Sequence, residues 1–450
     1  MPSSDCIIVG AGLAGLTCGF ELAERGWRPL LLEGKPFVGG RTASWRQDGM
    51  WVESGLHRFL GFYQALPSIL KRAGLNVNDI VVWEDSFEIR VPDGGPHAFF
   101  GAAPLHKPLR TVAGLIGNND LVPPLNKFRF ARFVTAGLRE YFQRPLDLDE
   151  RTVTEYARSH GVPQRLIDTV LTALTAGLFF LPPDRYSAYA FFGHLGPFLP
   201  RLVQFRVGGF LGGMTEVMCG PLAQAIQQRG GVVRTNAAVS RLQVQNDRVC
   251  GVELASGERL TAETVVLATP VNAAQEILKK DFATHPDLAT LFSLPSMPAI
   301  TVQCELDRPA TPQDRTIFGP GTALATFSEQ SRTTFRHVPG RLSTILAAPD
   351  ELMTSSDDDL LRIVQRDGSR VGLELKNRVV DYRVIRHPAD FYSFEPGTER
   401  KRPWQSTSIV SLTLAGDYTK QPYLQTMEGA VVSGQKAASI VLARMARKTR

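Results

Sequence analysis

The stretch Cys6-Ile-Ile-Val-Gly-Ala-Gly-Leu-Ala-Gly15 decides the fold of this 450-residue chain. Its first four residues have the length and β-branched content of a buried parallel strand. The segment from Leu13 to Arg25 carries apolar residues at helical spacing. The glycines therefore lie where a strand turns into a helix.

Each glycine of this turn suits a separate task in a dinucleotide site. Gly10 makes the tight turn, Gly12 lets the backbone approach a pyrophosphate, and Gly15 allows helix and strand to pack closely. Leu13 and Ala14 lie in the first turn of the helix, whose N–H groups and dipole favour anions. The stretch therefore predicts that the phosphates of a dinucleotide rest here.

The next predicted strand, Arg28-Pro-Leu-Leu-Leu-Glu33, supports this interpretation. It ends in a carboxylate about 20 residues after the glycines, where such a residue binds the hydroxyls of a ribose. No pair of basic residues follows Glu33 to bind a 2′-phosphate. The alternative is an ordinary strand–helix–strand unit with a glycine turn, and the position of Glu33 disfavours it.

Length and composition set the outer bounds. A chain of 450 residues favours two domains, and 43% hydrophobic with 21% charged residues indicates a globular protein. The net charge of +6 is modest, and no nucleic-acid-reading motif accompanies it. The five cysteines are widely spread and lack CxxC spacing, which indicates reduced thiols, and we nominate no metal ligands.

No membrane-spanning or targeting segment is predicted. No stretch reaches the ~18 uncharged apolar residues that a transmembrane helix needs. The N-terminus has no signal-peptide pattern, and Gly10 already belongs to the fold. We therefore expect a cytoplasmic protein.

Several motifs resemble those of the amine oxidase and carotenoid desaturase superfamily of FAD enzymes. Val38-Gly39-Gly40-Arg41 resembles the element that holds the flavin diphosphate. The run Gly55-Leu-His-Arg-Phe-Leu-Gly-Phe-Tyr63 resembles the GLH-x-F-x-G-x-Y stretch of plant-type phytoene and ζ-carotene desaturases. The segment from Leu412-Thr-Leu-Ala-Gly-Asp417 to Gly434 resembles a long C-terminal signature of the same branch.

The resemblance implies a set of FAD-binding residues. Gly55, Leu56 and His57 would lie beside the isoalloxazine ring, and Asp417 would meet the ribityl chain after Gly416. The adenine would pair with the backbone of Val239, and Met427 and Glu428 would lie near the ring. His57 is the single catalytic candidate; a histidine hydrogen-bonded within a turn is the alternative. Because no cysteine follows Cys304, we expect the FAD to be non-covalent.

The resemblance also implies an α/β architecture made of interrupted pieces. We expect a Rossmann-type FAD-binding domain from residues 1–75, 206–275 and 396–450. An α+β substrate domain is expected from residues 76–205 and 276–395. The aromatic run 186–200 could wall a hydrophobic tunnel or form ordinary core, and His194 lies near the place of an arginine that lines the pocket of plant phytoene desaturases.

The predicted activity is desaturation of a long, carotene-type isoprenoid by hydride transfer to flavin N5. Thr301 stands where many amine oxidases carry a lysine, which disfavours amine oxidation. A hydroxysqualene dehydroxylase, a carotene isomerase and a prenyl-binding escort protein without FAD stay as alternatives. The chain has no second GxGxxG for NAD(P)H, so a quinone or oxygen is the expected electron acceptor.

Residues 101–145 form a basic, aromatic segment. The segment contains seven basic residues and two acidic ones. Phe128, Phe130 and Phe133 are interleaved with Lys127, Arg129 and Arg132. This composition is typical of a surface that docks on anionic lipid, although a solvated helix with core phenylalanines is the alternative. We expect peripheral membrane contact through this segment.

Overall fold

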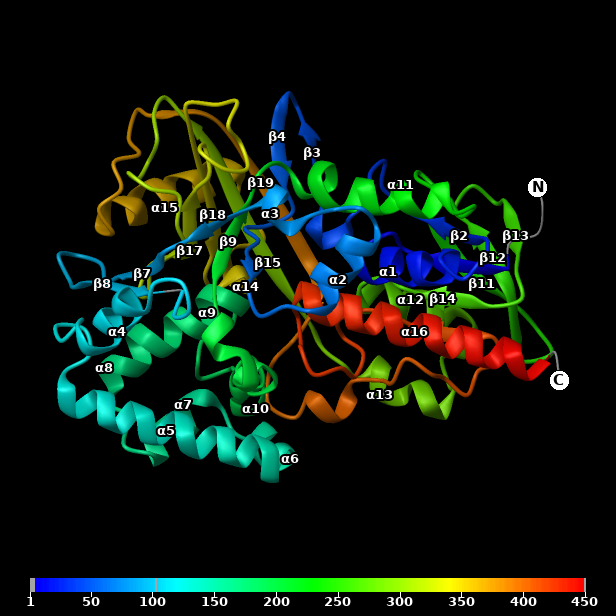
Figure 1. The fold of residues 1–450 in the computed structure, drawn as a ribbon, viewed down its shortest axis with the longest axis horizontal. Coiled ribbons are helices and arrows are strands. Elements are labelled where there is room, and N and C mark those ends of the chain that lie inside the picture. Colours follow the sequence, from blue (N-terminus) through cyan, green and yellow to red (C-terminus); the bar gives the residue numbers. More distant parts are fainter. Residues whose placement is uncertain (1–4, 102, 449–450) are drawn as a thin grey trace.

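The computed structural model describes residues 5–101 and 103–448 and contains a five-stranded parallel sheet, at the right of Figure 1. Neighbouring strands follow the order β10-β2-β1-β14-β20, so β1 pairs with both β2 and β14. The strands are β1 (Cys6–Val9), β2 (Pro29–Leu32), β10 (Val232–Arg234), β14 (Val265–Leu267) and β20 (Leu412–Leu414). Distant parts of the chain thus share one sheet.

Helices cover this sheet because its strands are apolar on both faces. Every residue of α1 (Leu13–Ala23) is buried, and the helix lies against α16 (Met427–Lys448) and α11 (Gly220–Gln228). A three-stranded antiparallel sheet, β11 (Val239–Gln245), β12 (Arg248–Leu254) and β13 (Arg259–Thr261), stands beside it. Together these elements have the α/β organisation predicted from the glycine motif.

A second, seven-stranded sheet lies next to the first (Figure 1). Its order is β19-β15-β18-β17-β16-β7-β8, antiparallel except where β16 meets β7. The strands are β19 (Val379–Tyr392), β15 (Ser296–Leu306), β18 (Gly340–Leu346), β17 (Leu324–Glu329), β16 (Ile317–Phe318), β7 (Ser86–Arg90) and β8 (His97–Gly101). β15 and β19 carry residues that reach the Ser54–Gly55 turn.

A helical lobe extends from this second sheet, at the lower left of Figure 1 and away from both chain ends. Its main helices are α4 (Pro108–Ile116), α5 (Pro124–Gln143), α6 (Pro145–Asp149), α7 (Val153–Ser159), α9 (Thr172–Phe179) and α10 (Ala188–Gly193). Phe133 of α5 is fully buried against Phe191, Phe192 and Tyr156. Our assignment of Phe133 to a lipid-facing surface is therefore wrong, since the aromatic residue fills the core of the lobe.

Short elements join the two sheets. β3 (Ser44–Gln47) and β4 (Met50–Glu53) form a hairpin, and β9 (Val207–Phe210) pairs with β5 (Phe59–Leu60) and β6 (Val81–Glu84). α2 (Ala65–Arg72) follows β5. The C-terminal helix α16 begins at Met427, because residues 423–426 form turns closed by the Thr426 hydroxyl and the Gln421 side-chain amide. Among the described residues, no helix is long and apolar enough to span a membrane.

Candidate FAD-binding and catalytic site

The glycine turn lies at the carboxyl end of β1, beside β14. Gly10 has φ +101°, and a β-carbon there would lie 2.7 Å from the Ala268 carbonyl oxygen. A β-carbon on Gly15 would lie 2.0 Å from the Gly10 oxygen, so close packing of helix on strand requires glycine. Gly12 is different, because its nearest atoms would be 3.9 Å away, in Gly39 and Gly40.

The three glycines Gly12, Gly39 and Gly40 together leave a strip of backbone without side chains, which we call the glycine strip. Gly12 and Gly39 form a parallel bridge, and the Gly39 amide donates to the Ala11 carbonyl at 2.9 Å. Gly39 and Gly40 have φ values of +117° and +55°, in the region that favours glycine. The N-cap of α1 is Gly12, and no side chain caps the first turn. Its N–H groups, those of Leu13 and Ala14 included, are thus available to an anion.

Glu33 follows β2 next to this strip. Its carboxylate accepts hydrogen bonds from the amides of Ala11 at 2.9 Å and Lys35 at 3.0 Å. The segment just before Val239 lies next to Glu33, because the backbone amide of Ala237 donates to the backbone carbonyl of Glu33. The predicted ribose ligand Glu33 and the predicted adenine contact Val239 are therefore brought to one end of the glycine strip.

Arg41 and Asp417 join the N-terminal and C-terminal motifs directly. Arg41 Nη2 lies 2.5 Å from Asp417 Oδ1, with the two side chains 22% and 6% exposed. Burial disfavours the charged guanidinium, but the Asp417 carboxylate outweighs it and holds the pKa of Arg41 above its ordinary value. Gly416, at φ +139°, lies in the turn that places Asp417 against Arg41.

A third group of residues surrounds Gly55 at the edge of the second sheet. A β-carbon on Gly55 would lie 3.3 Å from His57 Cε1 and 3.9 Å from Thr301 Oγ1. Thr301 is 3% exposed in β15 and lies beside Gly55. Its alignment with the lysine of amine oxidases stays a prediction. The Ser54 hydroxyl donates to the Arg41 carbonyl, which ties this group to the glycine strip.

His57 is held as a neutral ring. Its Nδ1 lies 3.0 Å from the Gly55 carbonyl oxygen, so Nδ1 carries the hydrogen and Nε2 keeps a lone pair. Burial first, and then the charges of His387, Arg41 and Arg58, together lower the pKa of His57 to about 4, against the effect of the Gly55 carbonyl. His57 is thus unprotonated at neutral pH and can accept a proton only weakly.

Met427 and Glu428 begin α16, where the resemblance places them near the flavin ring. The Glu428 carboxylate is 1% exposed and accepts the amides of Gln64, Ala65 and Leu66 at 2.7–2.9 Å. It therefore caps the N-terminus of α2, a role that the sequence prediction did not include. Contact of either residue with the ring stays a prediction.

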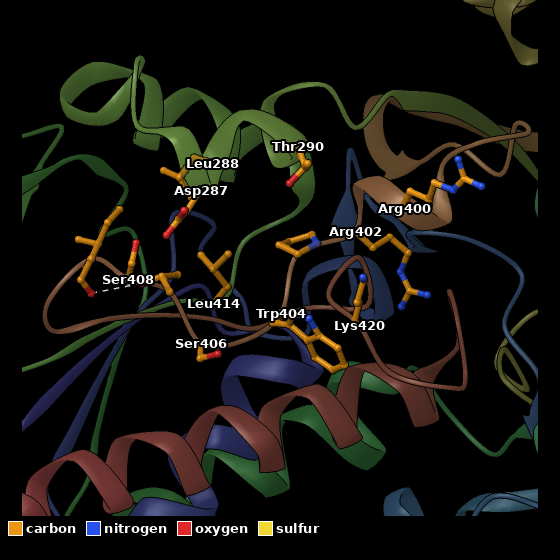
Figure 2. A pocket seen from close by; sticks show the side chains of 13 residues that line it. Asp287, Leu288, Thr290, Arg400, Arg402, Trp404, Ser406, Ser408, Leu414 and Lys420 are labelled. Atoms are coloured by element: carbon orange, nitrogen blue, oxygen red, sulfur yellow. Dashed lines mark hydrogen bonds between the residues drawn. The ribbon is translucent and has the colours of Figure 1, made fainter. Parts of the chain in front are cut away.

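Sequence reasoning missed Arg402, which supports the Asp417 turn from behind. Arg402 is 3% exposed and donates to the carbonyls of residues 417–419 and 421, while Nη1 binds Glu399 at 2.7 Å. It lines a cavity of about 320 Å³ together with Lys420 and Trp404 (Figure 2). No motif signals this role, because the arginine lies in an irregular loop.

The aromatic run that follows α9 is mostly core. Tyr186, Phe192 and Phe198 are at most 2% exposed. The His194 ring stacks on Phe179 at 3.7 Å, and the Tyr186 hydroxyl bonds its Nε2 at 2.7 Å. Burial lowers the pKa of His194 to about 3, so the ring is neutral and cannot replace the charge of an arginine.

Glu53 is a buried carboxyl just before the Ser54–Gly55 turn. Its backbone exchanges hydrogen bonds with the Gln303 amide, and Oε1 has no partner among the described protein atoms. Burial raises the pKa of Glu53 to about 7, partly offset by Gln330, Arg341 and Arg58. The folded protein therefore holds this proton more tightly than the unfolded chain does.

This shift predicts a loss of stability as pH rises. The Glu53 contribution is fully present below the ordinary pKa of 4.5 and decreases as pH rises through about 7. Its full size is about 3 kcal/mol at 1.36 kcal/mol per pKa unit. The free energy of unfolding, measured with urea, should decrease less between pH 5 and pH 8 in Glu53→Gln than in wild type. The exposed Glu276→Gln control should keep the wild-type slope, and equal slopes in all three proteins would contradict the prediction.

The geometry fits an FAD. The glycine strip and the uncapped α1 N-terminus suit a diphosphate, and the carboxyl ends of β1 and β14 are the usual ligand position in such sheets. Two buried oxygens at this edge, Thr269 Oγ1 and Asn272 Oδ1, have no partner among the described protein atoms, as expected of groups that face a ligand.

The chain is similar to known flavin enzymes over nearly its whole length. The family model described as flavin-containing amine oxidoreductase matches residues 13–442. The 15-cis-phytoene desaturase of Synechococcus elongatus is 29% identical, with 97% of this chain and 95% of the relative covered. A probable zeta-carotene desaturase of the same organism is 24% identical, with 97% and 98% covered. Among solved structures, cyclohexylamine oxidase of Brevibacterium oxydans has a TM-score of 0.71 at 17% identity, covering 99% of this chain and 100% of that one.

Proposed function

This chain belongs to the flavin-containing amine oxidoreductase family and is an FAD-dependent oxidoreductase, and from that premise we propose that it desaturates a long, carotene-type isoprenoid. Support comes from the desaturases that match it over 97% of its length, one of them named for phytoene and the other for zeta-carotene. When bound, FAD supplies a two-electron acceptor for a hydride from an allylic carbon.

The residues of the chain have separate tasks in this proposal. Arg41 and Asp417 hold the diphosphate and ribityl end together with the glycine strip, and Glu33 binds the ribose. Gly55 allows close approach to the ring, and the lone pair of His57 Nε2 receives the proton that leaves the neighbouring carbon. Thr301, 3% exposed beside Gly55, brings no charged group to this place.

The electrostatic potential at His57 favours an apolar substrate over a protonated amine. Burial has the largest effect on the pKa of His57, and the permanent cations Arg41 and Arg58 lower it as well, so the potential at the ring is positive. A protonated amine would be repelled there, whereas a hydrocarbon is indifferent to the field. The uncharged Thr301 hydroxyl offers no ammonium partner either.

Aromatic side chains next to Arg41 suit such a hydrocarbon. The Arg41 guanidinium lies 4.9 Å from the Phe391 ring centre, and Phe391 contacts Phe180 at the end of α9. Because Phe180 and Phe391 are only partly buried, they are our candidates for the wall of the substrate site. The electron acceptor proposed with this substrate is a quinone or oxygen.

The test is anaerobic mixing of the holoprotein with phytoene or ζ-carotene in liposomes, with hydroxysqualene and simple amines in parallel. We expect the flavin absorbance to fall with a carotene precursor. Bleaching by an amine alone would overturn the proposal, and turnover of hydroxysqualene alone would assign the dehydroxylase reaction. A prenyl-binding escort would show no flavin spectrum at all.

We further propose that the protein is cytoplasmic and docks on a membrane through a surface that we call the docking face. It consists of exposed apolar residues before and along α4 and at the start of α5, namely Leu105, Leu109, Val112, Ile116, Leu125 and Phe128. Leu109 is 85% exposed and Ile116 is 69% exposed, on one side of α4. Arg129 and Arg132, both exposed on α5, add positive charge.

Lys127, predicted from the sequence to contact lipid, has a structural role instead. The Lys127 ammonium donates to the carbonyls of Ile116 and Gly117 and to Asn119 Oδ1, so it caps the end of α4. Lys107 and Arg110 are paired with Asp85. The apolar side chains of α4, rather than Lys127, are therefore the groups to change in a binding experiment.

We expect Leu109→Gln/Ile116→Gln to release the protein from anionic liposomes. Each side chain contributes about 1.5–3 kcal/mol when buried in lipid, so the pair should weaken binding by at least about a hundredfold. The control is Val380→Gln, at a position that is 71% exposed in β19 outside the docking face. Flotation of the double variant equal to wild type would place the contact elsewhere.

A further inference from the structure

A second histidine lies beside the Ser54–Gly55 turn. His387 is in β19, opposite Ala299 of β15, and its side chain is 12% exposed. Its Nε2 lies 2.7 Å from the Ser54 carbonyl oxygen, and its Nδ1 lies 2.9 Å from Asp390 Oδ2. The ring thus connects β19 to the backbone that carries Gly55.

Both of these contacts need a proton on the histidine. A carbonyl oxygen can only accept a hydrogen bond, and so can an ionised carboxylate. Asp390 is ionised: burial is the largest single effect and raises its pKa, but His387, Arg41 and the Asn272 amide together outweigh burial and leave the pKa below the ordinary value. In a neutral His387 ring one nitrogen has no hydrogen, and its lone pair would point at an oxygen that can only accept. The two contacts therefore require a hydrogen on both nitrogens.

We propose that His387 is a positioning residue of this site, which holds the Ser54–Gly55 backbone as a doubly protonated ring and adds a positive charge to the burial that keeps His57 neutral. The two histidines then have opposite states. His57 donates only to the Gly55 carbonyl and leaves Nε2 bare, whereas His387 is saturated on both sides. This arrangement preserves a proton-accepting nitrogen next to Gly55.

The charged groups around the two rings are consistent with this assignment. Arg41 and Arg58 are the other cations that act on His57, and each has a carboxylate partner, Asp417 for Arg41 and Glu84 for Arg58. Asp390 also receives the Asn272 amide and lies in the field of Arg41. His387 is thus the histidine of the pair that has a carboxylate in direct contact.

The inference rests on the proposed flavin site and does not depend on which substrate is oxidised. The experiment uses holoprotein labelled with ¹⁵N in histidine, and compares wild type with His387→Gln, Asp390→Asn and His337→Gln. His337 is an exposed histidine in the loop after β17, so its variant controls for loss of any histidine. Flavin content and circular dichroism confirm that each variant is folded.

Three results are expected. At pH 7.5 wild type shows one histidine with both ring nitrogens protonated, and this signal is lost in His387→Gln. In Asp390→Asn the same ring becomes neutral. In His387→Gln the titration midpoint of His57 rises above about 4, while burial, Arg41 and Arg58 still hold it below the ordinary histidine value of about 6.5.

Two results would overturn the proposal. One is a His387 ring with a bare nitrogen at pH 7.5 in wild type. The other is a His57 midpoint in His387→Gln equal to that in the His337→Gln control. Failure of the desaturation proposal would appear separately, in the substrate test, because protonation states of the two rings are measured without turnover.

Discussion

Gly15→Ala is expected to abolish FAD binding by disrupting the fold, although alanine is the better helix former. The helical preference of alanine over glycine is worth about 1 kcal/mol. It is outweighed here, because the new β-carbon would lie 2.0 Å from the backbone oxygen of Gly10. Overpacking costs about 1–3 kcal/mol even where side chains can move, and a backbone oxygen cannot yield as they do. We expect a loss of at least about 3 kcal/mol of unfolding free energy in the apoprotein.

Gly12→Ala is the matched partner of this experiment. The nearest protein atoms to its β-carbon would be 3.9 Å away, and the Gly12 backbone has φ −74°, which alanine adopts freely. The apoprotein should keep its stability within about 0.5 kcal/mol. FAD affinity should fall about ten- to a hundredfold, since the methyl group occupies space that a diphosphate needs.

The measurements are urea unfolding of both apoproteins and FAD titration by fluorescence quenching. If Gly12→Ala bound FAD like wild type, the glycine strip would not be the diphosphate site. If Gly15→Ala kept the stability of wild type, the close packing of α1 on the turn would be wrong.

The second large effect is expected at the Arg41–Asp417 pair. Asp417→Ala leaves the Arg41 guanidinium without the carboxylate that lies 2.5 Å away. Breaking a buried pair costs about 3–5 kcal/mol, and because Arg41 is 22% exposed we expect the lower end, about 3 kcal/mol. Arg41→Met should cost a similar amount, because it leaves a carboxylate that is 6% exposed.

The double variant Arg41→Met/Asp417→Ala separates stability from cofactor binding. With both charges removed, no unpaired buried charge remains from this pair, so the double variant should recover part of the stability that each single variant loses. FAD should be lost from all three if, as we propose, both groups hold the diphosphate and ribityl end. Wild-type FAD content in the double variant would show that the pair is structural only, and additive stability losses would show that the two side chains are not coupled.

Local sequence was sufficient for the parts of the fold that depend on neighbouring residues. The strand, the glycine turn and α1 follow from the spacing of residues 6–25, because a turn at positive φ and a close helix contact can be met only by glycine. The same reasoning placed Glu33 at the end of β2, where it accepts the Ala11 amide. The C-terminal motif was recognised from its letters, and the structure joins it to the N-terminal motif through Arg41 and Asp417.

Surface and core could not be separated from composition alone. Phe128 and Phe133 lie in the same basic helix, yet Phe128 is 65% exposed and Phe133 is fully buried. Their spacing is consistent with either arrangement, and the neighbours that bury Phe133 come from α7 and α10. The exposed side of α4 became evident only once the lobe was assembled.

What the sequence by itself determined was the dinucleotide turn, the order of its strand and helix, and the family resemblance carried by short motifs. Only the tertiary structure decided which groups form hydrogen bonds between distant parts of the chain. His387 binds the carbonyl of Ser54, and Arg402 donates to carbonyls of the Asp417 turn. The physical reason is range. A turn or a helix is determined by dihedral angles and contacts within a few residues, whereas these hydrogen bonds depend on how two sheets, formed from distant segments, pack together.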